Sequence, residues 1–198
     1  MLQDVWAAID ERRYADAEAL LDGDSALRAS APGRMALGYI LAFTNRLGEA
    51  REVYAGLRNE ARAHANSVAE HVALHQLGMV ERMGGNLDTA LAVFQEERSL
   101  IGPGDEHAAS INAYELGYVN LLRGNLDEAR TWLTECKDLA ERGDDPIALG
   151  CAWRGLGELA AREGKADEAS EAYARAKTAF LDGEDEAAAR EVETLARA

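Results

Sequence analysis

Cysteine, proline, lysine and long apolar runs are all scarce in this 198-residue sequence. Cys136 and Cys151 stand in apolar-rich stretches, and the first residues do not resemble a secretion signal. We therefore expect two buried thiols in a reducing cytoplasm, not a disulfide. No stretch approaches the ~20 apolar residues that a membrane span requires. With 3 prolines and few β-branched runs, little in the chain interrupts a helix or favours a sheet.

Positive charge is also in short supply, since the formal net charge is −15. Such a surface repels a phosphate backbone and an anionic membrane, so we expect neither nucleic acid nor membrane as a partner. Alanine, leucine, glutamate and arginine dominate the composition, and all four favour helix. The sequence therefore predicts an all-α protein. The predominance of arginine over the three lysines indicates a GC-rich, bacterial genome.

A glycine followed 12 positions later by an alanine recurs four times along the chain. The pairs are Gly38 and Ala50, Gly78 and Ala90, Gly117 and Ala129, and Gly157 and Ala169. A turn-forming segment lies within each pair, which predicts two small residues at one level on opposite arms of a helical hairpin. An earlier copy ends at Ala17 and carries Val5 where the glycine would stand.

The residues around these pairs carry a family resemblance. Trp153, Leu156 and Gly157, followed by Ala169 and Tyr173, resemble the tetratricopeptide pattern W-x2-L-G and A-x3-F. Leu74, Leu77, Gly78, Ala90 and Phe94 match it in the preceding copy. The period near 40 residues resembles the longer-helix variety of the family. The aromatic residue usual after the glycine is replaced by Leu41, Glu81, Asn120 and Ala160.

The resemblance implies one repeat domain over residues 1–198. We expect a right-handed superhelical solenoid of about five antiparallel hairpins with a C-terminal capping helix. The expected repeats are 1–30, 31–65, 66–104, 105–144 and 145–182, with the cap at 183–198. The first helices of the hairpins are predicted at 2–12, 31–44, 66–83, 107–123 and 146–162. The second helices are predicted at 14–22, 47–60, 87–100, 126–142 and 166–181.

Motifs for catalysis or cofactor binding are not found in the sequence. No phosphate-binding loop follows a strand, no Cys-x-x-Cys is present, and no carboxylate stands in an apolar stretch in a way that suggests a tuned acid–base pair. We therefore predict a non-catalytic protein without a cofactor. His64, His71 and His75 share one face of a predicted helix, and His71 and His75 are spaced to share a metal. Two ligands make an incomplete site, and a solvated helix flank is the alternative interpretation.

A second set of side chains follows each glycine by one and five positions. We call it the first-helix stripe: Tyr39, Phe43, Met79, Met83, Tyr118, Leu122, Glu158 and Arg162. Val72 and Ile111 extend it. The two residues that follow each glycine are i,i+4 neighbours on one helix, and their side chains point away from the face that holds the glycine. In tetratricopeptide proteins the inner faces of the first helices line a groove, so the resemblance implies a groove here with His75, Arg82, Tyr114 and Arg154 at its rim. Ordinary core between repeats is the alternative.

Three functions follow from these observations. The first is a cytoplasmic protein-interaction scaffold or adaptor that takes a partner peptide or a neutral-to-basic amphipathic helix into the groove. The second is a self-associating homodimer, and the third, a metal protein or enzyme, depends on the histidines alone. The asparagine and lysine residues that clamp a carboxylate terminus in chaperone-binding members of the family are not in the stripe, so an acidic C-terminal peptide is not the expected ligand.

Overall fold

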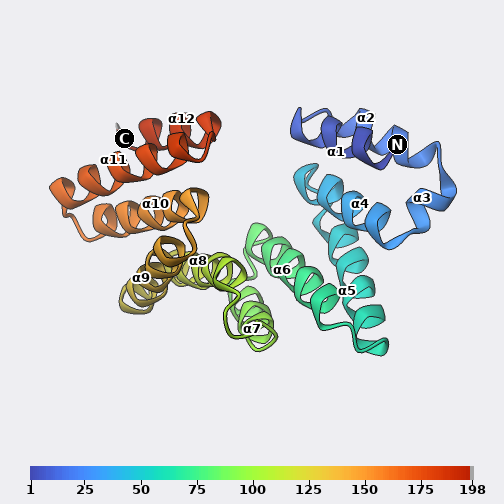
Figure 1. Ribbon diagram of the computed structural model, residues 1–198, viewed down its shortest axis with the longest axis horizontal. Coiled ribbons are helices and arrows are strands. Elements are labelled where there is room, and N and C mark those ends of the chain that lie inside the picture. Colours follow the sequence, from blue (N-terminus) through green and yellow to red (C-terminus); the bar gives the residue numbers. More distant parts are fainter. Residues whose placement is uncertain (197–198) are drawn as a thin grey trace. The chain divides into compact units, whose positions relative to one another are not determined.

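The computed structural model describes residues 1–196, which form twelve helices and no strand (Figure 1). None of these helices is long and apolar enough to cross a membrane. The helices fall into two compact units, Met1–Leu100 and Ile101–Ala198. The last two residues of the predicted cap, Arg197 and Ala198, lie outside the described residues.

Unit 1 is built from three hairpins and a short connecting helix. Its helices are α1 (Leu2–Asp10), α2 (Tyr14–Asp22), α3 (Ser25–Ala29), α4 (Ala31–Phe43), α5 (Leu47–Ala63), α6 (Ser67–Met83) and α7 (Leu87–Arg98). The pairs α1 and α2, α4 and α5, and α6 and α7 pack as antiparallel arms, and α5 also packs on α6 (Figure 1).

Unit 2 holds two hairpins and a terminal helix. Its helices are α8 (Glu106–Arg123), α9 (Leu126–Gly143), α10 (Pro146–Arg162), α11 (Ala166–Asp182) and α12 (Glu186–Leu195). The hairpins are α8 with α9 and α10 with α11; α12 packs along α11, with Val192 and Ala189 buried beside Tyr173 and Phe180. The all-α fold of paired helices and the terminal helix are thus confirmed. The single domain and its right-handed superhelix stay predictions.

The turns between helices share one backbone conformation. A residue with positive φ stands two positions before the next helix within each hairpin: Arg12, Asn45, Gly85, Gly124 and Gly164. Ala65, Gly104, Asp144 and Glu184 do the same between hairpins. The left-handed conformation stops one helix and reverses the chain. For this reason α1 ends at Asp10, before Arg12, and not at residue 12 as predicted.

One helix was not predicted. The segment from Asp22 to Asp24 was expected only to break the chain, but the Asp24 carboxylate accepts from the backbone N–H groups of Ala26 and Leu27 and starts α3. Ser30 ends α3 and its hydroxyl accepts from Gly33 N–H to begin α4. A single capping residue is therefore enough to place one more helical turn in this connection.

The predicted close approach at the glycines is confirmed. A Cβ added at Gly78 would lie 2.5 Å from the Phe94 ring, and one at Gly157 would lie 2.7 Å from the Tyr173 ring. Gly38 and Gly117 lie equally close to Tyr54 and Leu133. The residue that fills the space left by each glycine is thus the one four positions after the alanine, on the inward face of the second helix.

The departure from the family pattern after the glycine has a physical explanation. Glu81 and Asn120 are buried, and each bonds the asparagine five residues later in the turn. Asn86 Nδ2 donates to Glu81 Oε2 at 2.8 Å, and Asn125 Nδ2 donates to Asn120 Oδ1 at 3.2 Å. A polar residue here anchors the turn, a role that an aromatic ring could not perform.

Candidate protein-binding surface

In unit 1 the stripe residues of α4 belong to a row of aromatic rings. Tyr39 and Phe43 stack with centroids 4.4 Å apart, and Phe43 stacks on Tyr14 of α2 at 6.0 Å. Trp6 of α1 meets Tyr39 edge-on at 5.9 Å. Tyr39 is half-buried, whereas Phe43 keeps 42% of its surface exposed. The sequence analysis did not include Trp6 and Tyr14, because only the packing of α1 and α2 brings them to α4.

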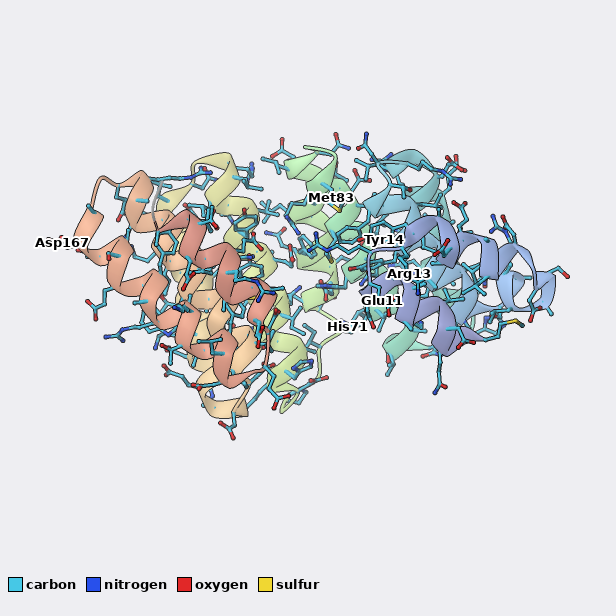
Figure 2. All side chains as sticks on the ribbon, turned by 90° about the horizontal axis from the view of Figure 1, so that it is seen from above. Glu11, Arg13, Tyr14, His71, Met83 and Asp167 are labelled. Atoms are coloured by element: carbon cyan, nitrogen blue, oxygen red, sulfur yellow. The ribbon has the colours of Figure 1, made fainter. Side chains whose placement is uncertain are left out.

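The stripe residues of α6 lie on the same unit. Met79 and Arg82 are half-buried, and Met83, at the end of α6, is 38% exposed. Figure 2 labels Met83 on α6 and Tyr14 on α2. Phe43 and Met83 are therefore large apolar side chains that face solvent near the C-terminal ends of two first helices.

His75, predicted at the rim of the groove, is half-buried against α7. Its ring packs 6.0 Å from the Phe94 ring, and its Nδ1 atom is 3.2 Å from Oε1 of Glu97 on α7. His71 Nδ1 lies 3.5 Å from the same oxygen. Both rings thus turn into the α6–α7 hairpin and do not form a solvated flank. In residues 1–196 no three or more His, Cys, Asp or Glu side chains are arranged to hold a metal ion.

Glu97 is a carboxylate whose side chain is fully buried, and the sequence analysis did not single it out. The sequence contains a signal for this. Glu97 stands seven positions after Ala90, and the equivalent residues in other copies are Leu57, Cys136 and Ala176, all buried. A carboxylate in an otherwise apolar register predicts an internal polar partner, which here is the histidine pair.

In unit 2 the stripe and rim residues form one polar–aromatic cluster. The Tyr114 and Tyr118 rings stack at 5.6 Å, and the Arg154 guanidinium lies 5.6 Å from the Tyr114 ring and donates to its hydroxyl. Arg154 also lies 4.0 Å from Glu158 and 3.7 Å from Glu191 on α12. The structure therefore brings together the predicted residues of α8 and α10 and adds Glu191.

Burial sets the protonation chemistry of this cluster. It raises the pKa of Glu158 above its ordinary value, and nearby Arg154 only partly opposes the effect. Burial likewise raises the pKa of the Tyr114 hydroxyl. Arg162 donates to the Leu121 carbonyl at 2.6 Å, while Leu122 is half-buried. Glu158 is thus a carboxylate in a poorly solvated site whose ion pairing is incomplete.

Comparison with known proteins now identifies the architecture. Residues 108–182 match the family model described as tetratricopeptide repeat. This region, which lies in unit 2, belongs to the tetratricopeptide repeat family. No curated protein sequence matches it.

Two solved structures share the fold over nearly all of the chain. One is a signal transduction ATPase with numerous domains (STAND) from Pyrococcus horikoshii, described as having a tetratricopeptide repeat sensor. It is 15% identical with a TM-score of 0.78, and the match covers 96% of this chain and 30% of that one. The other is BtubC (BKLC) from P. vanneervenii, 14% identical with a TM-score of 0.66, covering 100% of this chain and 90% of that one. At these identities the likeness concerns the fold.

Tetratricopeptide repeats mediate protein–protein interaction, and the fold is typically a non-catalytic scaffold. The candidate residues of the two units differ in the kind of side chain that they present. Unit 1 presents exposed aromatic and methionine side chains, and unit 2 presents stacked tyrosines beside Arg154 and Glu158.

Proposed function

We propose that this protein is a non-catalytic adaptor that binds a helical or extended segment of a partner protein along the inner faces of its first helices. The observation that carries the proposal is the exposed apolar end of the stripe in unit 1. Phe43 faces solvent within the row of stacked rings, and Met83 faces solvent at the corresponding end of α6. Clustered apolar side chains on a soluble protein mark interaction sites. Aromatic and methionine side chains are enriched at such sites.

Unit 2 supports a basic character for the partner. Glu158 lies 4.0 Å from Arg154, and burial raises its pKa although Arg154 and Arg162 both oppose the effect. A lysine or arginine of the partner would complete the ion pairing of Glu158 and contact the stacked tyrosine rings. The net charge of −15 favours encounter with such a segment over long range.

A cytoplasmic adaptor agrees with the cysteines. Cys136 and Cys151 are both free thiols, and Cys136 is fully buried. Free buried thiols persist in a reducing compartment, as the composition predicts. The proposed role is therefore to hold a partner in the cytoplasm, with any output supplied by that partner.

A site-directed crosslinking experiment tests the proposal. A photo-reactive phenylalanine analogue replaces Phe43, Met83 or Tyr118 in cells, and a control replaces the exposed Glu52 of α5. We expect the same foreign protein to be crosslinked from the stripe positions and not from Glu52. Met79→Glu, in the same unit, should abolish the crosslink from Phe43, whereas Leu181→Glu, an exposed apolar residue outside the stripe, should leave it intact. Equal crosslinking from all positions, or none from the stripe, contradicts the groove.

A further inference from the structure

A second apolar feature lies at the opposite end of the first helices in unit 1. A cleft of about 480 Å³ opens where the beginnings of α4 and α6 meet the end of α5. Leu57 and Ala61 of α5 are its buried floor, and Met35, Val68 and Val72 belong to its walls. Its volume and lining are those of a binding site, because binding clefts span ~300–1,000 Å³ and are mostly apolar. The stripe residues Phe43 and Met83 lie at the other ends of α4 and α6, so the cleft is separate from that exposed end of the stripe. Val72, which was expected to extend the stripe, lies on the wall of the cleft.

An exposed apolar ridge stands directly on the wall of this cleft. Val68 is 73% exposed and Val72 is 39% exposed. The two residues are i,i+4 neighbours on α6, so their side chains project from one face of the helix. A small molecule filling the cleft would leave most of Val68 in water, whereas a protein surface laid over the cleft would cover it. The occupant is therefore a macromolecule.

The charges around the cleft indicate which macromolecule fits. Among the described residues that line it, Glu60 is the only carboxylate, and both its oxygens are held by the Arg34 guanidinium, with Arg34 Nη1 to Oε1 at 2.6 Å. His64 Nδ1 donates to the Glu60 carbonyl at 2.7 Å. The cleft thus lacks the spare negative charge that would recruit a basic partner. It is a locally neutral site on a chain of net charge −15.

We infer that the cleft and ridge together form a self-complementary interface, and that the occupant is a second copy of this chain. In a two-fold arrangement each copy places its Val68 and Val72 ridge over the Leu57 and Ala61 floor of the other. A two-fold interface of this kind uses one patch on both subunits, so ridge and cleft must lie on the same patch, as they do here. Two strongly acidic chains can meet only where their charges are already paired, and the Arg34–Glu60 pair satisfies that condition.

The sign of the salt dependence separates this proposal from binding of a basic partner. Long-range repulsion between two chains of charge −15 is screened by salt, so dimerisation should tighten several-fold between 50 and 500 mM NaCl. Attraction to a basic segment would weaken over the same range.

Analytical ultracentrifugation of the full chain over a concentration series tests the inference. We expect a monomer–dimer equilibrium that Val68→Asp weakens by about tenfold or more, since it buries a charge in the interface. Ala31→Trp, at an exposed position lining the cleft, should weaken it by filling the site. Leu181→Asp is the matched control, an exposed apolar residue of α11 that should not change the equilibrium. Circular dichroism confirms that each variant remains folded.

Three results would overturn the inference: a monomer at every concentration, a dimer indifferent to Val68→Asp, or a dimer that weakens with salt. None of them bears on the stripe, because the crosslinking from Phe43 and Met83 reports on the other end of α4 and α6. Crosslinking from Val68 to a foreign protein in place of a second copy would also overturn it.

Discussion

The Nδ1 atom of His75 lies 3.2 Å from Oε1 of Glu97, a carboxylate without exposed surface. His71 approaches the same oxygen from one helical turn earlier on α6. A buried carboxylate requires donors, and His75 Nδ1 lies within hydrogen-bond distance of Glu97, whereas His71 Nδ1 makes no hydrogen bond. His71 and His75, which the sequence offered as a metal pair or as part of a solvated flank, are therefore half-buried against α7, whereas His64 is exposed.

This relationship predicts a coupled loss of stability. His75→Leu removes a polar partner from buried Glu97 and should lower the free energy of unfolding by about 1–3 kcal/mol. Glu97→Gln should cost less in the His75→Leu background than in the wild-type chain, because the neutral amide no longer needs the ring. Urea denaturation of the two single variants and the double variant measures the coupling. Additive losses would show that the two side chains do not depend on each other.

Two glycine substitutions should change stability in opposite directions. In Gly78→Ala the new Cβ would lie 2.5 Å from the Phe94 ring, so the variant should lose about 1–3 kcal/mol by overpacking. Gly56 lies within α5 with no atom in the way, so Gly56→Ala should gain about 0.5–1 kcal/mol from helix propensity. Thermal unfolding of both variants checks the pair. A stable Gly78→Ala protein would contradict the close packing of α6 on α7.

The Arg51–Glu81 pair should contribute to loss of stability in acid. The hydrogen bond from Arg51 is the main cause that lowers the pKa of buried Glu81 below its ordinary value. Because the folded pKa is the lower one, the stabilisation is present above the unfolded pKa of ~4.3 and is lost as the pH falls through the folded pKa. Glu81→Gln should therefore flatten the acid limb of a stability-versus-pH curve, and Glu52→Gln, an exposed change on α5, should leave it unchanged. Parallel acid limbs for wild type and Glu81→Gln would contradict the pairing.

The thiols should be free but slow to react. Burial raises the pKa of Cys151 to about 11 and raises that of Cys136 further, so little thiolate forms at pH 8. A chromogenic disulfide reagent at that pH should react slowly with the native protein and count two thiols after unfolding without reductant. Fewer than two thiols in the unfolded chain would indicate a disulfide, and rapid reaction in the native chain would contradict the burial.

The sequence by itself determined which residues form helices and how each hairpin is registered. Helical propensity, capping and turn residues act over a few positions, and the glycine–alanine spacing matches two arms across a turn of fixed length. Gly78 could therefore be placed opposite the second helix before the structure was known, and the contact with Phe94 confirms it. The one helix that was not predicted, α3, is only five residues long and begins at the single cap Asp24. A helix this short has too few residues to show a helical pattern in the sequence.

Only the tertiary structure decided which side chains of the stripe reach solvent. Phe43 is exposed while Leu122 is half-buried, although each stands five positions after the glycine of its copy. Neighbouring helices also decide three other features. They set the direction of the His75 ring, they bring Trp6 and Tyr14 to the aromatic row on α4, and they form the cleft beside Val68. The physical reason is that helical periodicity fixes the angle at which a side chain leaves its own helix, whereas burial depends on what another helix places against it.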